Sequence, residues 1–485
     1  MIKQLNKSTV EKVGRPVRIL QFGEGNFLRA FVDWQIDIAN EKGVMDAGIA
    51  VCQPIIDPEH KVLGMIDMLR KQDNMYHVYL EGIENKQPKK DVRLVKSVMD
   101  SFNPYVDYAK YEQYFLSPEL KITISNTTEA GIRYEEGDDL TAEPPKSYPA
   151  KMTALLYKRF KHFNGDPTKG LCIICCELIE NNGSTLHEYV IKHAEYHKLG
   201  QDFIDWVEKN CHFCDTLVDR IVPGFPREQI DEIKQEIGYD DNLVVKAELY
   251  HLWAIGGPGY KEVMKELPLD KAGLHVIFMP SIKQFRDKKV RILNGSHTGM
   301  VPIALQMGCE TVMDAFNTPA IERFINEMVA EEVIPMIDED REELTKFAAG
   351  ILERFYNPFI KHMLRSISLN SLSKWEARNY PTVKDNWFKA HKLAERECFT
   401  FAALMTLYGP KSGFEPDDTK EFVEYIRAAW DSNDLEATIA KIVSKSGIFT
   451  VDFSEVPGFV PAVAGYVRDI ETLGMKAALA KLLEK

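Results

Sequence analysis

The chain has 485 residues, of which 45% are hydrophobic and 27% are charged. This length predicts two or three domains with sizeable cores, and the composition is typical of an ordinary globular protein. The formal net charge of −13 and the lack of a long basic run argue against nucleic acid or an anionic membrane as partners. No apolar run approaches the length of a membrane span, and residues 1–16 do not resemble a signal peptide. We therefore expect a cytoplasmic protein, with no obligate protein partner evident.

Two Cys-x-x-Cys pairs, Cys172 with Cys175 and Cys211 with Cys214, superficially resemble a zinc ribbon. The first pair lies in an apolar run that is typical of a β-strand. Residues three apart on a strand point to opposite faces, so these two thiols are poorly placed to share a metal ion. Neither pair has the glycine or proline that shapes a zinc knuckle. We predict no metal site and buried free thiols, as in a reducing compartment.

The first elements of the chain predict a nucleotide-binding βαβ unit. Residues 17–22 form a short apolar strand that leads into a glycine turn. A long amphipathic helix follows to about Glu41, and residues 48–52 form a second strand. In this order, backbone N–H groups and a helix N-terminus face a pyrophosphate. The candidate cofactor-binding residues of the turn are Gly23, Gly25, Asn26 and Phe27.

The glycine turn departs from the usual dinucleotide fingerprint in two places. Leu28 occupies the third glycine position, and the second strand ends at Gln53 instead of at an acidic residue. Asp57, four residues further on, is a poorly placed substitute. The loop alone therefore leaves the choice between NAD and NADP open, and a merely tight turn is the alternative interpretation.

The rest of this half alternates predicted strands and helices. A hairpin pattern covers residues 75–98. Further strands are predicted at residues 120–125, 171–176, 242–245 and 274–279, and helices at residues 105–116 and 147–163. Such alternation predicts an α/β fold with a doubly wound, Rossmann-type sheet.

Polar side chains follow the predicted strand at residues 120–125. Asn126, Thr128 and Glu129 stand where the loops at the carboxyl ends of strands line a cofactor crevice. We predict that they contact the nicotinamide ribose, and a helix N-cap is the alternative. Residues 177–183 form a second polar loop of this kind.

A helix-rich stretch then contains residues 216–223, which read Thr-Leu-Val-Asp-Arg-Ile-Val-Pro. Within it, Asp219 and Arg220 form a charged pair among apolar residues and are predicted to be partly buried. A self-contained salt bridge explains this pair as well as a function does.

The sequence pattern changes near residue 280. Residues 1–280 are predicted to form the dinucleotide-binding Rossmann-type domain. Residues 281–485 are almost wholly helical in period, which predicts a mainly α-helical substrate and catalytic domain. The helical pattern is interrupted at residues 378–381 and at turns near Gly409-Pro410 and Pro457-Gly458.

The stretch from Lys289 to His297 holds three polar side chains among apolar residues of helical period. On an α-helix, Asn294 and His297 share one face, and Lys289 lies about 80° around the axis and roughly 12 Å below His297. A lysine at the helix entrance can reach the same surface, which suits proton transfer while an amide and an imidazole hold one oxygen. From this stretch alone, an ordinary amphipathic helix with a surface lysine is the favoured interpretation.

Several motifs in a fixed order resemble one family. They are GEGNFLRA at residues 23–30, TEAG at residues 128–131, NNG at residues 181–183, VDRIVP at residues 218–223, and Lys289-x4-Asn294-x2-His297. Together they resemble the mannitol dehydrogenase family, the polyol-specific long-chain dehydrogenases, over nearly the whole chain. The combination is far more specific than any single motif.

The resemblance implies a zinc-independent hydride transfer between NAD(H) and a secondary alcohol or ketone. It makes Lys289 the general acid/base and lets Asn294 and His297 hold the reacting oxygen. Asp219 matches the family's aspartate and is expected to orient the substrate. Leu178 stands where mannitol-type members carry an asparagine, so that contact is lost or replaced. A lysine active near neutral pH needs a depressed pKa, which desolvation between two domains can supply.

We expect a small-molecule sugar acid as the substrate, and its carboxylate needs a cation. The resemblance favours Lys374 for this role, with His362 next. The helical domain offers four candidates, Lys361, His362, Arg365 and Lys374. Each is also explained as a solvated surface charge. The motifs leave a neutral polyol open as a substrate, and they argue against a nucleotide-binding sensor, which would not require an intact Lys-Asn-His set.

Overall fold

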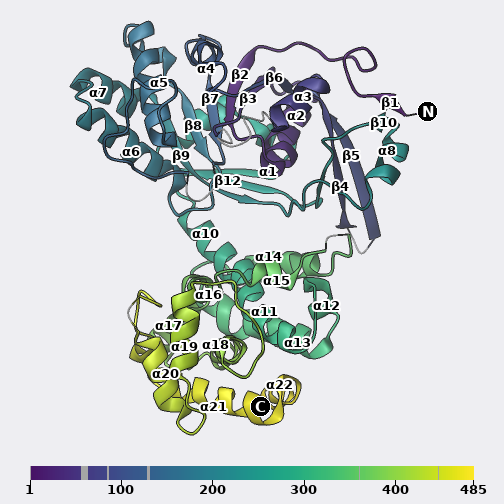
Figure 1. Cartoon of the computed structure of the whole chain (residues 1–485), viewed down its shortest axis with the longest axis vertical. Coiled ribbons are helices and arrows are strands. Elements are labelled where there is room, and N and C mark those ends of the chain that lie inside the picture. Colours follow the sequence, from purple (N-terminus) through teal and green to yellow (C-terminus); the bar gives the residue numbers. More distant parts are fainter. Residues whose placement is uncertain are drawn as a thin grey trace. The chain divides into compact units, whose positions relative to one another are not determined.

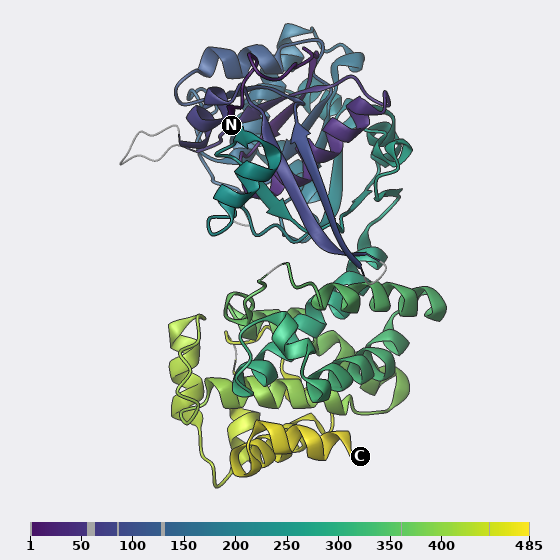
Figure 2. The ribbon, with the colours of Figure 1, turned by 90° about the vertical axis from the view of Figure 1, so that its right-hand side faces the viewer.

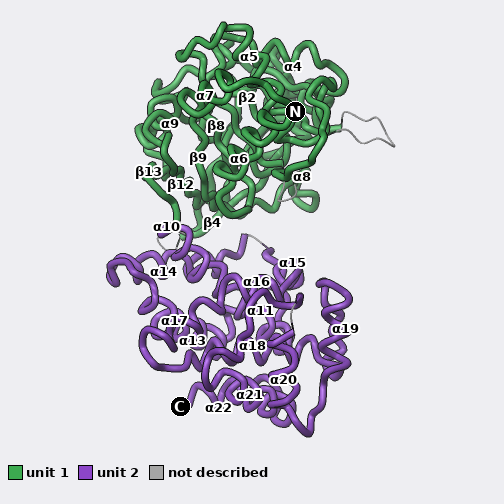
Figure 3. The backbone as a smooth tube through the Cα atoms, turned by 90° about the vertical axis from the view of Figure 1, so that its left-hand side faces the viewer, with its two compact units in different colours: residues 1–283 green, residues 284–485 purple. Residues whose placement is uncertain are grey.

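The computed structural model describes residues 2–55, 64–84, 87–127, 131–359, 361–445 and 447–484. The chain forms two compact units, residues 1–283 and 284–485 (Figure 3). Each unit has hydrophobic core clusters of its own. Among the described residues, no helix is both long and apolar enough to cross a membrane.

Unit 1 is built on an eight-stranded sheet (Figure 1). Its neighbouring strands are parallel, except that β9 and β12 run antiparallel. In spatial order the strands are β13 (Val276–Met279), β12 (Leu252–Gly256), β9 (His212–Asp219), β8 (Cys172–Cys175), β7 (Ile122–Ser125), β2 (Val17–Phe22), β3 (Gly48–Cys52) and β6 (Val98–Phe102). The chain builds outward from β2 first to one side and then to the other. The switch point of the sheet therefore lies between β2 and β7, where such folds bind ligands.

Helices cover both faces of this sheet (Figure 1). One face packs against α4 (Tyr108–Phe115), α5 (Tyr148–His162), α6 (Asn182–Tyr196) and α7 (Gln201–Asn210). The other face packs against α1 (Asn26–Leu28), η1 (Arg29–Asp33), α2 (Trp34–Glu41), α3 (Gly64–Lys71), α9 (Tyr260–Glu266) and η3 (Leu269–Ala272). The predicted βαβ start is confirmed, because β2, the glycine turn, a helix ending at Glu41 and β3 follow in that order.

Two smaller sheets complete unit 1. The predicted hairpin at residues 75–98 is confirmed as the antiparallel pair of β4 and β5. The three-stranded sheet contains β11 (Val245–Ala247), β4 (Tyr76–Glu84) and β5 (Gln87–Val95), and the two-stranded sheet contains β1 (Lys3–Gln4) and β10 (Tyr239–Asp240). The remaining elements are η2 (Pro167–Lys169) and α8 (Ile230–Ile237).

The prediction of a helix-rich stretch around residues 216–223 is wrong, because residues 216–219 are the end of strand β9. This strand lies between β8 and β12 in the sheet. A strand covered on both faces shows a continuous apolar run instead of an alternating one. Its periodicity therefore does not distinguish it from a buried helix.

Cys172 and Cys175 lie on opposite faces of β8, as their spacing predicts. Cys172 belongs to the core on the α2 face, and Cys175 belongs to the core on the α5 face. All eight cysteines are free thiols, and seven of them are buried. In the part of the chain that the structure describes, no group of three or more His, Cys, Asp or Glu side chains could hold a metal ion.

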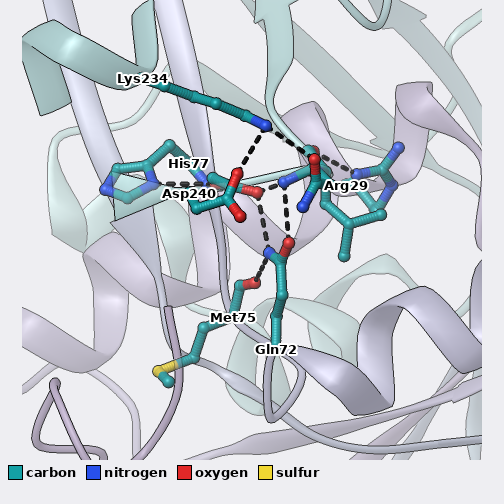
Figure 4. Close-up of polar contacts among 9 residues, drawn as sticks. Arg29, Gln72, Met75, His77, Lys234 and Asp240 are labelled. Atoms are coloured by element: carbon teal, nitrogen blue, oxygen red, sulfur yellow. Dashed lines mark hydrogen bonds and ion pairs between the residues drawn. The ribbon is translucent and has the colours of Figure 1, made fainter. Parts of the chain in front are cut away.

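A buried polar network ties the smaller sheets to the helix that follows the glycine turn, and Figure 4 shows Gln72, His77 and Arg29 within it. The Asp241 carboxylate accepts hydrogen bonds from Gln72 Nε2 and from the Leu243 N–H, each at 2.8 Å. Arg29 donates to the Leu243 carbonyl at 2.7 Å and to the Glu24 carbonyl at 3.1 Å. Because Glu24 lies in the glycine turn, this network fixes the backbone there.

Every regular element in the described residues of unit 2 is a helix (Figure 2). From residue 283 onward they are α10 (Lys283–Lys289), η4 (Val290–Asn294), α11 (Gly295–Gln306), α12 (Val312–Phe316), α13 (Pro319–Met328), η5 (Val329–Val333), η6 (Ile334–Met336), α14 (Arg341–Phe355), α15 (Leu364–Ile367), α16 (Ser371–Arg378), α17 (Tyr380–Ala390), α18 (Glu395–Tyr408), α19 (Lys420–Ala429), α20 (Leu435–Val443), η7 (Phe453–Glu455), α21 (Phe459–Leu473) and α22 (Met475–Leu483). The predicted fold class, a Rossmann-type domain followed by a mainly helical one, is confirmed.

Helix α18 forms the centre of unit 2. Its residues 397–408 are all buried, and it packs against α11 and α21. The predicted helix interruptions are confirmed around it. Helix α16 ends at Arg378, α18 ends just before Gly409, and α21 begins just after Gly458.

Candidate active site

The glycine turn brings two backbone segments close together at the end of β2. Gly23 has a φ of +126°, and an added Cβ would stand 3.2 Å from the Asn126 carbonyl oxygen and 3.1 Å from Leu28 Cδ1. Its N–H donates to the Cys52 carbonyl at 2.9 Å, which joins the ends of β2 and β3. Gly25 follows as the N-cap of the helix. Glycines at these places leave the helix N-terminus open to a phosphate group.

A cavity of about 440 Å³ opens beside the turn, within unit 1. Three of the predicted cofactor-binding residues line it, namely Gly23, Gly25 and Asn126. The rest of its wall includes Pro54, Ile55, Ser147, Tyr148 and Lys151. Thr128 and Glu129, also predicted to bind the cofactor, lie outside the described residues. The cavity therefore joins the glycine turn to the loops that follow β3 and β7.

The other two residues predicted in the turn make contacts within unit 1. The Asn26 side chain accepts a hydrogen bond from Arg29 at 2.6 Å. The Phe27 ring stacks on Phe31, with ring centroids 4.9 Å apart. Both contacts stiffen the first turns of the helix that begins at Gly25, and neither side chain is among those that line the cavity.

Lys151 is a cavity residue that the sequence motifs do not single out. It is 3% exposed, and its Nζ donates to the Lys146 carbonyl at 2.6 Å and to Tyr105 Oη at 3.1 Å. Burial lowers the pKa of Lys151 to about 8. The sequence signal that could have pointed to Lys151 is the start of α5. There Ser147 caps the helix and Pro149 stands in its first turn. A lysine one turn further on faces the loops at the carboxyl edge of the sheet.

Glu177 holds the loops after β7 and β8 together. Its buried carboxylate accepts hydrogen bonds from the Thr127 N–H and Oγ1, each at 2.9 Å, and from Ser125 Oγ at 3.1 Å. Burial raises the pKa of Glu177. The neighbouring Leu178, at which the family resemblance predicts the loss of an asparagine contact, is exposed in unit 1. This arrangement shapes the cavity wall next to Asn126.

Asp219 and Arg220 are both buried at the end of β9. The Arg220 guanidinium donates to the Ala30 carbonyl at 2.7 Å and to the Tyr250 carbonyl at 3.1 Å, and it lies 4.1 Å from the Trp34 ring centroid. Arg220 therefore ties the sheet to the first helix. Asp219 stands at the carboxyl edge of the sheet, because β9 runs parallel to β8.

The stretch from Lys289 to His297 lies inside a helix, so the predicted position of Lys289 at a helix entrance is wrong. The helix begins at Lys283 and continues through α10, η4 and α11. Lys289 is the last residue of α10, and η4 is a π turn that ends at Asn294. A π turn changes the angle between the residues on either side of it, so the ideal α-helical offset of Lys289 from His297 does not hold. Single π turns of this kind are frequent at functional sites.

His297 lies in an aromatic and cationic environment. It is 7% exposed, and its ring stacks on Phe355 with centroids 4.2 Å apart. The His362 ring stands nearly perpendicular to it at 5.2 Å. Burial lowers the pKa of His297 well below its ordinary value, and the neighbouring His362 and Arg354 lower it further. The imidazole is therefore neutral at physiological pH, and its Nε2 has no hydrogen-bond partner among the described residues.

Lys289 and Asn294 flank the π turn that precedes His297. Lys289 is 8% exposed, and Asn294 is half-buried. The charge of Lys289 is among those that lower the pKa of His297, so the amine lies within electrostatic reach of the imidazole. A buried amine, an amide and a neutral imidazole on one helix can exchange a proton with an oxygen and hold it.

The cations predicted to bind a carboxylate are placed differently from one another. His362 lies beside the imidazole of His297. Arg365 is exposed and stacks on Phe414, with its guanidinium carbon 4.2 Å from the ring centroid. Lys374 donates to the Ile367 carbonyl at 3.1 Å.

Two arginines that sequence reasoning missed reach the same environment. Arg354 at the end of α14 and Arg378 at the end of α16 both act on the pKa of His297. They come from separate helices, and no motif around them marks a shared site. A cation near the end of a helix is also explained by the helix dipole. Only the tertiary structure therefore distinguishes these two arginines from other cations at helix ends.

A mostly parallel sheet with a glycine-turn cavity at its switch point, followed by a helical unit with a largely buried Lys-Asn-His set, defines a two-domain nucleotide-dependent dehydrogenase. The family profiles agree with this class. The mannitol dehydrogenase Rossmann domain matches residues 17–270, and the mannitol dehydrogenase C-terminal domain matches residues 281–471. The chain belongs to the mannitol dehydrogenase family.

Relatives match the chain over its full length. An altronate oxidoreductase of Bacillus subtilis is 40% identical over 99% of this chain and 98% of its own. An altronate oxidoreductase of Bacteroides thetaiotaomicron is 41% identical over 99% of this chain and 100% of its own.

Solved structures share the fold. A D-sorbitol dehydrogenase in substrate-free form has a TM-score of 0.80 at 20% identity. A Pseudomonas fluorescens mannitol 2-dehydrogenase in ternary complex with NAD and D-mannitol has a TM-score of 0.74 at 21% identity. Each comparison covers 99% of this chain and 100% of the other.

Proposed function

We propose that the protein catalyses the NAD-dependent interconversion of D-tagaturonate and D-altronate, the tagaturonate reductase reaction of hexuronate catabolism. The observation that carries this proposal is the full-length similarity, at 40% and 41% identity, to proteins named altronate oxidoreductase. The set of Lys289, Asn294 and His297 supports dehydrogenase chemistry, because a catalytically inactive nucleotide sensor would not require all three.

The glycine-turn cavity fits the cofactor. Gly23 and Gly25 would let the pyrophosphate approach the backbone, and the helix N-terminus that begins there favours negative charge. Asn126 and Lys151 line the same cavity and would hold the nucleotide against the sheet edge. When bound, NADH supplies the hydride that reduces the carbonyl carbon.

The residues of unit 2 handle the oxygen and its proton. As the carbonyl carbon gains the hydride, the electron pair of the C=O π bond moves onto the oxygen. The Lys289 ammonium protonates that oxygen, and Asn294 and His297 hold it by hydrogen bonds. Because the His297 imidazole is neutral, it donates a hydrogen bond without competing with Lys289 as the acid. In the oxidative direction, Lys289 takes the proton from the alcohol.

Two related activities are the alternatives within the family. A fructuronate reductase acts on a sugar acid of different stereochemistry, and a mannitol dehydrogenase acts on a neutral polyol. The test is NADH consumption by the purified protein with D-tagaturonate, D-fructuronate and D-fructose in parallel. We expect the highest kcat/KM with D-tagaturonate, and equal or reversed preference would contradict the proposal.

We place this reaction in the cytoplasm, with a small-molecule sugar acid and the nicotinamide cofactor as its partners. All eight cysteines are free thiols, which is typical of a reducing compartment. The chemistry assigned to Lys289, Asn294 and His297 needs no metal ion.

A further inference from the structure

Arg378 lies against the helix that carries His297, although it comes from a different part of the chain. It is the last residue of α16, and its Nη1 donates to Thr298 Oγ1 at 3.1 Å. The next residue, Asn379, donates to the Gly295 carbonyl at 3.1 Å. Two successive residues at the end of α16 are thus bonded to the first turn of α11. This double attachment holds Arg378 against the residue that follows His297.

Arg378 is a half-buried cation that forms no ion pair with any carboxylate in the described ranges. By contrast, Arg291 on the same helical stretch as His297 pairs with Asp385 at 2.7 Å. Burial lowers the pKa of Arg378, and no neighbouring negative charge opposes that shift. Removing a guanidinium from water costs free energy unless an anion compensates, and the last turn of a helix offsets only part of that cost.

The guanidinium is suited to a carboxylate. Arginine carries five N–H donors in a planar fork that binds carboxylates through two parallel hydrogen bonds. In a 5-keto sugar acid the carboxylate carbon lies four bonds from the ketone carbon, about 5 Å away for carbon–carbon bonds of about 1.5 Å. Arg378 Nη1 donates to Oγ1 of Thr298, which directly follows His297, and the charge of Arg378 lowers the pKa of His297. The guanidinium therefore lies within electrostatic reach of the imidazole.

We propose that Arg378 is the specificity-determining residue that binds the carboxylate of the sugar acid while Asn294 and His297 hold the oxygen on the reacting carbon. This inference rests on the proposed function and assigns its substrate class to one side chain. Arg365 stacks on Phe414 and Lys374 donates to the Ile367 carbonyl, whereas Arg378 is bonded directly to the residue that follows His297. A neutral polyol has no charge for Arg378 to bind, whereas the carboxylate of a sugar acid supplies the anion that the Arg378 guanidinium lacks.

The test compares Arg378→Gln with the wild-type protein. We expect the KM for D-tagaturonate to rise roughly 10- to 100-fold, the range for losing a hydrogen-bonded charge partner. The kcat changes little, because the carboxylate is bound equally in the ground and transition states. The inhibition constant of the product D-altronate rises by the same factor. NADH binding and the unfolding midpoint, measured on the same samples, show whether the variant is folded.

Two further variants separate charge recognition from a structural role. Arg378→Lys keeps the charge but loses the fork, so its KM should fall between those of Arg378→Gln and the wild type. Arg468→Gln makes the same kind of change at an exposed arginine of α21 and should leave KM unchanged. An unchanged KM in Arg378→Gln, a loss of kcat at constant KM, or an equal rise in Arg468→Gln would overturn the assignment of Arg378.

Wild-type turnover tests the proposed function separately. If the wild-type protein prefers D-fructuronate, the tagaturonate assignment fails, and the same KM comparison with D-fructuronate still decides the role of Arg378. If the wild-type protein uses D-tagaturonate and Arg378→Gln keeps the wild-type KM, the function stands and this inference fails.

Discussion

The polar groups of the segment from Lys289 to His297 work in a largely buried setting, since Lys289 is 8% exposed and His297 is 7% exposed. Burial disfavours charge, so it keeps the imidazole neutral. The segment therefore combines one group that can carry a proton with two that can hold an oxygen. This division of roles leads to two predictions at the scale of single residues.

Replacing Lys289 with Ala should lower kcat by roughly 100- to 10,000-fold, the usual range for losing a general acid/base. Binding of NADH should be retained, because the glycine-turn cavity belongs to unit 1. Steady-state NADH consumption and a fluorescence titration of NADH measure the two effects. Lys283→Ala, an exposed lysine at the start of the same helix, is the control and should keep wild-type kcat. Turnover that survives in Lys289→Ala would show that another group moves the proton.

The depressed pKa of His297 should make the folded state less stable in acid. The unfolded chain binds a proton at this histidine below about pH 6.5, while the folded state resists protonation, so the stability is lost as pH falls through that value. We expect the free energy of unfolding of His297→Gln to depend less on pH in this range. Urea denaturation of both proteins between about pH 5 and 8 measures it. Identical pH dependence in the two proteins would mean that His297 is not the group concerned.

At the scale of elements, the glycine turn and the start of α18 carry the clearest physical constraints. The turn needs a positive φ and a close approach to the loop after β7. The start of α18 is held by a buried cluster in which Asn379 donates to Glu397 Oε2 at 2.9 Å and to the Gly295 carbonyl at 3.1 Å. That cluster links the most buried helix of unit 2 to the helix of His297.

Gly23→Ala should weaken nucleotide binding. An added Cβ would press on the Asn126 carbonyl oxygen at 3.2 Å, and alanine disfavours the φ of +126°. We expect the Kd for NADH to rise about 10-fold or more, while the helical unit is unaffected. Gly14→Ala is the matched control, because its added Cβ meets nothing within 4 Å. A fluorescence titration giving equal Kd values for the two variants would contradict this account of the turn.

Glu397→Gln should make the stability of the protein less sensitive to pH. Burial and then the neighbouring Glu332 raise the pKa of Glu397 to about 8. The folded state keeps this proton after the unfolded chain has released it near pH 4.5, so stability is lost as pH rises from about 4.5 to 8. The glutamine keeps the shape and does not titrate. In thermal unfolding at several pH values, the midpoint should fall less with rising pH for the variant than for the wild type. An equal fall would contradict the protonation of Glu397 in the folded state.

The sequence predicts elements best where a local signal is strong. The strand, glycine turn and helix at residues 17–41 carry such signals, and so do the helix stops near Gly409 and Gly458. The end of β9 is mispredicted, because burial on both faces removes the alternation that marks a strand. The π turns at Arg29–Asp33 and Val290–Asn294 are not visible in sequence, because they keep the helical pattern while changing its register.

For the whole molecule, the chemistry of the site is easier to predict than its specificity. The segment from Lys289 to His297 is contiguous and forms a recognisable motif. Arg378 and Lys151 come from helices distant in the sequence, and only the folding of each unit brings them to His297 and to the glycine turn. The proposed choice of a sugar acid over a polyol thus depends on tertiary contacts that local patterns do not encode.

The central claim is metal-independent hydride transfer from NADH to the ketone carbon of D-tagaturonate. Its most direct test uses NADH deuterated at the transferred position, protein dialysed against a chelator, and product analysis by NMR and mass spectrometry. The account predicts D-altronate with one deuterium at C-5 and a kcat unchanged by dialysis. A product without deuterium, the opposite configuration at C-5, or activity that returns only when a metal ion is added would contradict it.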